Sequence, residues 1–344
     1  MSKLEYKLSL LIPGWNAAHY IENCVNSLLE NDYTNFEIIL ITGGSDDSYN
    51  ISLKLKKKYP IKIKAFKQEI PHKNTALNIG LKGVTGDIIV LTDIDCVYQK
   101  NWLSSINKIF QNQNYNVITG LYLPLPDRNN TLAEFNRIKI GNNLLKFKNE
   151  TVIIGNKLCG ANSAFRKETF LDKIGKFDEK IPTGDDKILG ITFNKNGEDL
   201  YYFRDIYVYT ECYSNSLKGF IRRRIRWAKD LYITLNKKRI IKLLISFGIA
   251  LFKLLYPIAI LIFWLLFLQS DIFLLITLLV PWLIFYLLYM SYFFFQLRKS
   301  SIKVNNHLGT NFNFRKAFKI VPILFFTYSI ITIMSILYPK RSKW

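Results

Sequence analysis

The chain has few of the residues that build disulfide frameworks or zinc sites. Its 344 residues include four cysteines and three histidines, and no two cysteines have the C-x-x-C spacing. These residues are Cys24, Cys96, Cys159, Cys212, His19, His72 and His307. Such scattered cysteines indicate reduced thiols in a core. They argue against a disulfide scaffold and against a structural zinc site. His72 has no partner nearby in the sequence, so we expect a solvated loop histidine.

The sequence also shows no pattern typical of a cleavable signal peptide and no internal repeat. Residues Met1 to Tyr6 are polar, and the apolar segment Leu8 to Ile12 is too short for the core of a signal peptide. No stretch of the sequence repeats itself at a fixed spacing. We therefore expect no cleaved signal.

Acidic residues are scarce. The chain has 26 acidic and 47 basic residues, which gives a formal net charge of +21. Such a charge fits a nucleic acid or an anionic membrane surface. The membrane explains it better, because part of the charge flanks long apolar runs and no stripe of alternating aromatic and basic residues is present. We expect membrane lipids as partners and no nucleic acid.

Long uncharged runs occur only in the C-terminal part. Ile272 to Leu297 and Ile320 to Pro339 contain no charged residue, and Leu243 to Leu268 is interrupted only by Lys253. About 20 apolar residues cross a bilayer. A lysine at mid-bilayer costs roughly 2.5 to 3.5 kcal/mol unless it reaches the interface. We predict a membrane domain at residues 239–344 with about three transmembrane helices; alternatively, Ile240 to Phe252 lies flat on the membrane.

The basic residues between the runs predict the orientation. Gln269 to Asp271 has no positive charge, whereas residues 298–319 are rich in lysine and arginine. By the positive-inside rule this second loop is cytoplasmic, and so is the N-terminal domain. Lys340, Arg341 and Lys343 run against the rule in this arrangement. The prediction is a multi-pass protein of the cell membrane with its N-terminal domain in the cytoplasm.

Residues 1–238 alternate between apolar strands and helical patterns. The expected strands are Leu8 to Ile12, Phe36 to Ile41, Ile61 to Phe66 and Ile88 to Leu91. Strands that alternate with helices over about a hundred residues predict an α/β fold with a doubly wound, mostly parallel sheet. In such a sheet, ligands bind where the strands end.

Two of these strand ends carry residues suited to a phosphorylated ligand. After Ile88 to Leu91 come Asp93 and Asp95; if the segment stays extended, both carboxylates share one face and can hold a divalent cation and, through it, a diphosphate. The alternative is a solvated turn. After Phe36 to Ile41, Gly43 and Gly44 let the backbone approach a ligand, and we expect Ser45 to cap the next helix.

In these features the chain resembles the family 2 glycosyltransferases, over Leu8 to about Trp227. The matching motifs, in order, are Pro13 to Asn16, Gly44-Ser45 with Asp47, Lys73 with Ala76-Leu77-Asn78, Gly86-Asp87, Asp93-Ile94-Asp95, Gly160 to Arg166, Gly184-Asp185-Asp186 and Arg223 to Trp227. The resemblance implies a GT-A type fold. It also implies a glycosyltransferase of the hexosyltransferase type that moves a sugar from a nucleotide-diphosphate donor with inversion.

The resemblance assigns roles to particular residues. The predicted donor-binding residues are Pro13, Asn16, Thr42, Gly44, Asp47, Lys73, Asn78 and Asp93. Asp95 is the predicted ligand of Mg²⁺ or Mn²⁺, whose preference for oxygen ligands fits a carboxylate with a diphosphate. For Lys73 the alternative is a surface lysine at the start of a helix.

The acceptor side is assigned in the same way. Asp186 is the predicted catalytic base, with Asp185 as its neighbour; the alternative is that both acids merely cap a helix beginning at Lys187. Arg226 and Trp227 are predicted to contact the diphosphate or the acceptor, and the alternative is an anchor at the membrane interface.

Two positions depart from the family pattern. Thr42 stands where the family commonly has an acidic residue that reads the nucleotide base. We expect a UDP-sugar as the donor, although this chain lacks the acidic residue that would identify the base as uracil. Arg223 replaces the glutamine of the Q-x-x-R-W motif found in membrane-bound synthases. A domain tethered to three spans predicts a lipid-linked or growing glycan as the acceptor. Because Arg223 replaces this glutamine and three spans are few for a translocating channel, we expect addition of one or a few sugars. A processive synthase that extrudes its polymer is the alternative, and a scaffold or transporter without activity is a further one.

Overall fold

The computed structural model describes residues 5–112, 114–125, 130–147, 150–181, 184–210, 216–229, 237–267 and 272–337. Contacts divide the chain into two compact units, which are described separately. The first comprises Met1–Asp127 and Phe147–Tyr213, and the second Arg128–Lys146 and Ser214–Ser342. The functional boundary expected at residue 238 stays a prediction.

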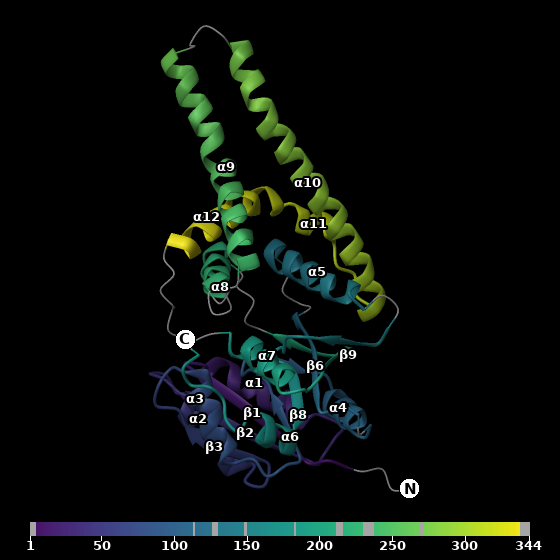
Figure 1. The fold of residues 1–344 in the computed structure, drawn as a ribbon. Coiled ribbons are helices and arrows are strands. Elements are labelled where there is room, and N and C mark those ends of the chain that lie inside the picture. Colours follow the sequence, from purple (N-terminus) through teal and green to yellow (C-terminus); the bar gives the residue numbers. More distant parts are fainter. Residues whose placement is uncertain are drawn as a thin grey trace. The chain divides into compact units, whose positions relative to one another are not determined.

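The first unit is built on one mixed sheet (Figure 1). Its strands in the described part of the chain are β1 (Leu8–Trp15), β2 (Phe36–Gly43), β3 (Ile63–Lys67), β4 (Ile88–Leu91), β5 (Cys96–Tyr98), β6 (Val117–Pro124), β7 (Val152–Gly155), β8 (Ser163–Arg166) and β9 (Leu200–Thr210). The order is β3-β2-β1-β4-β8-β6-β9-β5, and β7 pairs with β9. Strands β3, β2, β1 and β4 are parallel, whereas β8 runs antiparallel to β4 and β6. The predicted α/β sheet is confirmed.

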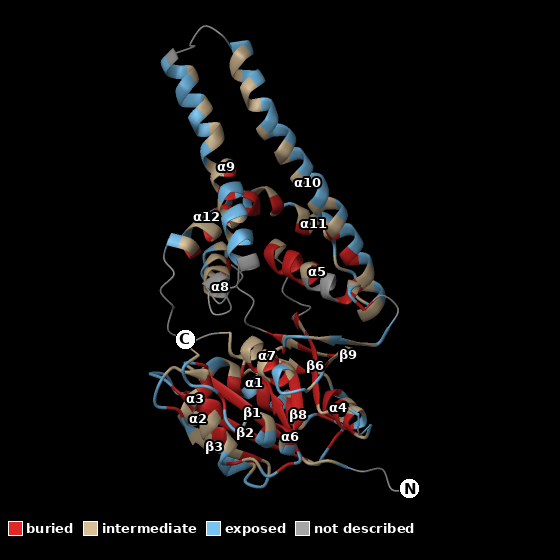
Figure 2. Ribbon diagram, in the orientation of Figure 1, coloured by how far each residue is buried: buried red, intermediate tan, exposed pale blue. Residues whose placement is uncertain are grey.

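Helices cover both faces of this sheet, and the period of two in the strands sorts the side chains between them. On one face, Leu10 and Ile12 pack with α1 (Ala18–Leu29), α2 (Ser48–Lys58) and α4 (Trp102–Phe110). On the other, Leu11 and Ile39 pack with α3 (Lys73–Leu81), α6 (Lys167–Lys173) and α7 (Asp185–Lys195). Figure 2 shows the strands as mostly buried. The sheet is therefore doubly wound.

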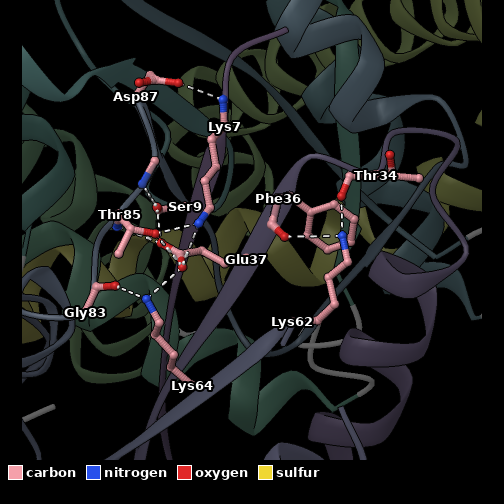
Figure 3. A network of polar contacts seen from close by, with 11 residues as sticks. Lys7, Ser9, Thr34, Phe36, Glu37, Lys62, Lys64, Gly83, Thr85 and Asp87 are labelled. Carbon is pink, nitrogen blue, oxygen red and sulfur yellow. Dashed lines mark hydrogen bonds and ion pairs between the residues drawn. The ribbon is translucent and has the colours of Figure 1, made fainter. Parts of the chain in front are cut away.

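A buried carboxylate fastens the sheet at the end where β2 begins. Glu37 is 3% exposed and accepts hydrogen bonds from Ser9 Oγ (2.6 Å), Lys64 Nζ (2.8 Å) and the backbone N–H of Thr85 (2.7 Å) (Figure 3). Lys7 Nζ adds an ion pair at 3.7 Å. Burial alone would raise the pKa of Glu37, but these donors lower it to about 2. The network ties β1, β2, β3 and the turn before β4 together.

We predict that Glu37→Gln destabilises the first unit by roughly 1.5 to 3 kcal/mol, because the buried carboxylate that accepts hydrogen bonds from Ser9 and Lys64 loses its charge. The thermal midpoint of the full chain in detergent should fall by about 5 °C. Since the pKa of Glu37 lies below its ordinary value of 4.5, this stabilisation is present above that pH and is lost as the pH falls toward 2.

The matched control is Glu69→Gln, because Glu69 forms an exposed ion pair with Lys67 at 3.1 Å. Exposed pairs contribute about 0 to 1 kcal/mol, so this variant should melt close to wild type. Equal midpoints for the two variants would contradict the role given to Glu37.

The second unit is helical. Its described helices are α5 (Thr131–Leu145), α8 (Leu217–Lys229), α9 (Lys237–Phe267), α10 (Ile272–Leu308), α11 (Phe314–Phe318) and α12 (Val321–Leu337). Apolar residues of α5, α8, α10, α11 and α12 form one core, with Phe135, Phe220, Leu297 and Leu324 among them. Lys253 of α9 is 7% exposed and lies over the rings of Tyr289 (4.3 Å) and Phe325 (4.5 Å). The lysine that interrupts an apolar run is thus packed inside the helical unit by cation–π contacts.

Within the described residues, two helices are long and apolar enough to cross a membrane, and the expected number of about three stays a prediction. Their apolar segments are Ile240–Leu266 and Ile272–Leu308. Many of their apolar side chains are exposed, including Leu244 and Phe273. Figure 2 shows exposed positions along both helices. The third predicted span forms α12, a shorter apolar helix of 17 residues with several buried side chains. Helix α10 continues to Leu308, so the first part of the expected loop 298–319 is helical.

Candidate functional site

The loops after β1 and β2 are joined through Asn16. This residue has a φ of 52°, and its side-chain Oδ1 accepts a hydrogen bond from the backbone N–H of Ser45 at 2.7 Å. Its own N–H donates to Gly43 O at 3.0 Å. Gly44 has a φ of 120°, and a Cβ there would lie 2.2 Å from Asn16 Oδ1. Only glycine fits at this approach, so Asn16 and Gly44 build one continuous wall at the ends of the two strands.

Other predicted donor-binding residues of this region have different surroundings. Pro13 is buried within β1. Thr42 is fully buried, and its Oγ1 lies 2.8 Å from Ser52 Oγ; its side chain faces the core and not the strand edge. Asp47 is exposed before α2 and accepts from Asn50 Nδ2 at 3.2 Å.

The expectation that Ser45 caps α2 is wrong. Asp46 Oδ1 accepts from the N–H of Ser48 at 3.1 Å and from its hydroxyl at 2.5 Å. The N-cap residue of α2 is Asp47, and the Ser45 hydroxyl donates instead to Asn16 Oδ1 at 3.3 Å.

Lys73 lies at the centre of the site. Its Nζ donates to Asp93 Oδ1 at 2.7 Å and lies 3.8 Å from Asp185 Oδ2. Its side chain is 14% exposed. Burial would lower the pKa of Lys73, but the negative charges of Asp93, Asp185 and Asp186 outweigh it, so the pKa is raised and the ammonium stays charged. The structure thus brings three separate sequence motifs together around one cation.

The two acids after β4 are not extended. Residues Ile94 and Asp95 form a turn, in which the N–H of Cys96 donates to Asp93 O at 3.1 Å. The condition for both carboxylates sharing a face through the strand period is therefore not met; a turn places them instead. Asp93 and Asp95 are both partly exposed. Among the described residues there is no cluster of three His, Cys, Asp or Glu side chains that could hold a metal ion.

Asp185 and Asp186 begin α7. Gly184 precedes them with a φ of 71°, in the left-handed region that favours glycine. Asp186 Oδ2 accepts from the N–H of Gly160 at 3.2 Å, and Oδ1 from the N–H of Lys187 at 2.7 Å. Desolvation and the charge of Asp185 raise the pKa of Asp186 to about 6. The helix begins at Asp185, two residues before the expected Lys187. The hydrogen bond from the Lys187 N–H to the Asp186 carboxylate leaves this carboxylate able to accept a proton.

Gly160 leaves room for this cluster. A Cβ at Gly160 would lie 3.1 Å from Lys73 Nζ and 3.3 Å from Asp186 Cβ. The following loop is fixed by Asn162, which is buried and donates to Leu121 O at 2.8 Å. The segment Gly160 to Arg166 therefore supplies a close backbone and a rigid support to the site.

Asn78 and His72 hold the chain before α7. Asn78 Nδ2 donates to Phe177 O at 2.9 Å and to Glu179 Oε1 at 2.7 Å; these contacts are structural, and a role in donor binding stays a prediction. The expectation that His72 is merely solvated is wrong. Its ring accepts a hydrogen bond from the N–H of Thr75, and its Nε2 lies 2.9 Å from Ile181 O. Sequence reasoning missed this because the partner is more than a hundred residues away.

Arg226 and Trp227 belong to the second unit. Arg226 is partly exposed on α8. The side chain of Trp227 lies outside the described residues. Neither residue belongs to the cluster around Lys73 in the first unit. Their contact with the diphosphate or the acceptor stays a prediction.

Comparison with known proteins places this geometry in a family. The family described as "Glycosyltransferase like family 2" matches residues 6–229. The chain belongs to this family of glycosyltransferases. The matched range contains every strand of the sheet and each of the acids around Lys73.

Curated relatives agree with this assignment over part of their length. An uncharacterized glycosyltransferase of Nostoc sp. is 31% identical over 106 residues, which cover 30% of this chain and 33% of the relative. One of Rickettsia conorii is 26% identical over 194 residues, which cover 52% of this chain and 30% of the relative. The chain therefore spans about a third of the length of these relatives.

A solved structure shows the shared fold. The mannosyltransferase PcManGT from Pyrobaculum calidifontis, in complex with GDP-Man and Mn²⁺, has a TM-score of 0.55 and 16% sequence identity, with 98% of this chain and 89% of that chain covered. The chain thus shares the GT-A type sheet of this structure, as the sequence predicts.

Proposed function

We propose that the protein transfers a sugar from a nucleotide-diphosphate donor to a membrane-associated, lipid-linked glycan, with inversion at the anomeric carbon. The observation that carries this proposal is the meeting of Lys73, Asp93, Asp185 and Asp186 where the strands end. A single buried cation among several carboxylates supplies both a partner for a diphosphate and a carboxylate of raised pKa. These are the two groups that an inverting transfer requires.

The donor would lie along the wall formed by Asn16 and Gly44, with its diphosphate near Lys73. Lys73 is held as a point charge by Asp93 and Asp185, and an anionic diphosphate would compete for it. The solved mannosyltransferase binds GDP-Man, which supports a nucleotide-sugar donor. We propose a UDP-sugar for this chain, although the buried side chain of Thr42 offers no contact to the base.

Asp95 and Asp93 would be the protein's ligands for a divalent cation once a donor is present. They supply carboxylate oxygens, and diphosphate oxygens and water would complete the coordination that Mg²⁺ or Mn²⁺ prefers. The Mn²⁺ of the solved mannosyltransferase supports this assignment. When bound, such a cation stabilises the charge that develops on the leaving diphosphate.

Asp186 would act as the base. As the acceptor oxygen bonds to the anomeric carbon, the bond from that carbon to the diphosphate oxygen breaks, and the acceptor proton passes to the Asp186 carboxylate. The N–H groups of Gly160 and Lys187 hold that carboxylate in place. A pKa of about 6 leaves it ionised at neutral pH and more basic than an exposed carboxylate.

The apolar helices α9 and α10 support an acceptor at the membrane, with the catalytic unit on the cytoplasmic side where nucleotide sugars occur. Their exposed apolar side chains require a nonpolar surrounding. A lipid-linked glycan would meet the enzyme in that setting. Formation of a long polymer is the alternative outcome.

The test is to incubate purified full-length protein with a panel of nucleotide sugars, with and without membrane lipid extract, and to measure release of nucleotide diphosphate. Organic extraction and gel sizing of the labelled product follow. We expect release from one donor that depends on the lipid extract, with a short, extractable product. Release from no donor would contradict the proposal, and a polymer of high molecular weight would favour the processive alternative.

Asp95→Asn is predicted to weaken donor binding about tenfold, or ~1.4 kcal/mol, because it removes one carboxylate from the proposed cation site. Chelator should weaken wild-type binding to a similar extent and have little further effect on the variant. Isothermal titration with nucleotide diphosphate, with and without Mn²⁺, measures both.

The matched control is Asp172→Asn, whose side chain is 70% exposed and should leave binding unchanged. Full affinity of wild-type protein in excess chelator would refute the role of the cation.

A further inference from the structure

Helix α3 grips the chain segment 177–181 along its length. Asn78 both donates to Phe177 O and accepts from the Phe177 N–H, at 2.9 Å each. Asn74 Nδ2 donates to Asp178 O at 2.7 Å, and Thr75 Oγ1 to Glu179 Oε2 at 2.9 Å. Three side chains of α3, together with His72 just before it, therefore bind a segment about a hundred residues further along the chain.

His72 is the last of these contacts and uses both ring nitrogens. Nδ1 accepts from the backbone N–H of Thr75 at 3.3 Å, which caps α3. Nδ1 also lies 3.0 Å from Thr75 Oγ1. Because the carbonyl of Ile181 can only accept, Nε2 carries a hydrogen and donates to Ile181 O at 2.9 Å. One imidazole thereby fixes the start of α3 and the end of the gripped segment at the same time.

The two ends that His72 joins are both next to the site. His72 directly precedes Lys73, whose Nζ contacts Asp93. Ile181 lies four residues before Asp185, where α7 begins. Gly175 and Gly184, with φ of 77° and 71°, lie on either side of the gripped segment. Both glycines adopt a left-handed conformation that other residues rarely reach. Between them, the side chains of α3 hold the segment that precedes Asp185.

We propose that His72 is a positioning residue that sets Asp186 relative to Lys73 by holding Ile181 against the start of α3. It touches neither donor nor acceptor in this role and acts through the backbone leading to α7. The proposal rests on the proposed function, in which Asp186 takes the acceptor proton. A cap of α3 alone would require only Nδ1, whereas positioning requires Nε2 as well.

His72→Asn separates the two roles, because asparagine is a good N-cap but is too short to reach Ile181 O. We expect its thermal midpoint to stay near wild type and its affinity for nucleotide diphosphate to stay within about twofold. Its kcat should fall about tenfold, which corresponds to ~1.4 kcal/mol, because small displacements of a base are costly. His72→Ala, which loses both bonds, should lower kcat equally and also lower the thermal midpoint.

Hydrogen exchange in the free protein gives a readout that does not depend on activity. The peptide covering residues 177–186 should exchange faster in His72→Asn than in wild type. His19→Asn, a change at an exposed histidine of α1, is the control and should alter neither exchange nor kcat.

Unchanged exchange together with wild-type kcat in His72→Asn would overturn the positioning role and leave only the cap. If wild-type protein transfers no sugar from any donor, the proposed function fails; faster exchange of 177–186 would then still show that His72 holds the segment.

Discussion

Asp186→Asn is expected to lower kcat by roughly 10² to 10⁴ while affinity for nucleotide diphosphate stays near wild type, because a general base usually contributes that factor. Asparagine keeps the size of the side chain and still accepts a hydrogen bond from the N–H of Gly160 or Lys187. It has no lone pair basic enough to take a proton from a hydroxyl. The chemical step is therefore lost without loss of the fold.

The measurement is steady-state turnover with saturating donor, paired with titration of nucleotide diphosphate. Asp185→Asn serves as the comparison, since Asp185 contacts Lys73 and not Gly160. If Asp186→Asn reduced binding and turnover equally, the acids would serve only to cap α7. If Asp185→Asn alone abolished turnover, Asp185 would be the base.

The pH profile follows from the same residue. Because the pKa of Asp186 is raised to about 6, kcat should fall as the pH drops below that value and the base becomes protonated. In Asp186→Asn the residual activity should lose this acid limb. The change in shape distinguishes loss of a base from a general loss of active protein.

The sheet could be predicted because each of its parallel strands has a recognisable local sequence pattern. Leu8 to Ile12 and Phe36 to Ile41 are continuous apolar runs, as strands buried on both faces require. The observed strand ends differ from the predicted ones by a few residues; the third strand, for example, begins at Ile63 and not at Ile61. The antiparallel strand β8 between β4 and β6 was not predicted, since pairing between distant segments leaves no local pattern.

Local motifs found the residues of the site, but not how they meet. Lys73, Asp93 and Asp185 come from three segments, and only the fold puts one ammonium between two carboxylates. Thr42 shows the opposite limit: the resemblance assigns it a contact with the donor, whereas the pleat turns its side chain to Ser52 in the core, so donor binding at this position stays a prediction. A period-two pattern does not say where a strand stops alternating, so the orientation of its last residue is the least predictable.

Length separates the candidate membrane spans from the other apolar helix. The runs behind α9 and α10 are long enough to cross a membrane, whereas α12 is a shorter apolar helix. Val321 and Leu324 of α12 belong to a core that also contains Leu297 of α10. An apolar run reads the same whether lipid or protein surrounds it. Only packing distinguishes these cases.

Lys73→Met is expected to lower kcat/KM by about 10², since charge-assisted hydrogen bonds of this kind contribute roughly 1.5 to 3 kcal/mol. Methionine keeps the bulk of the side chain but removes the cation that lies 2.7 Å from Asp93 and 3.8 Å from Asp185. The diphosphate then loses its point charge. The three carboxylates lose the group that offsets their mutual repulsion.

The same variant makes a second prediction that a surface lysine could not. Desolvation and Asp185 raise the pKa of Asp186, and the charge of Lys73 lowers it. Without that charge the pKa of Asp186 should move above 6, so the acid limb of the kcat profile should shift to higher pH. Lys73→Arg keeps a positive charge and should leave the limb near its wild-type position. Profiles measured from pH 5 to 9 for wild type and both variants test this; an acid limb that stays in place in Lys73→Met would mean that Lys73 lies too far from the base to influence it, and the central place of this lysine in the site would be lost.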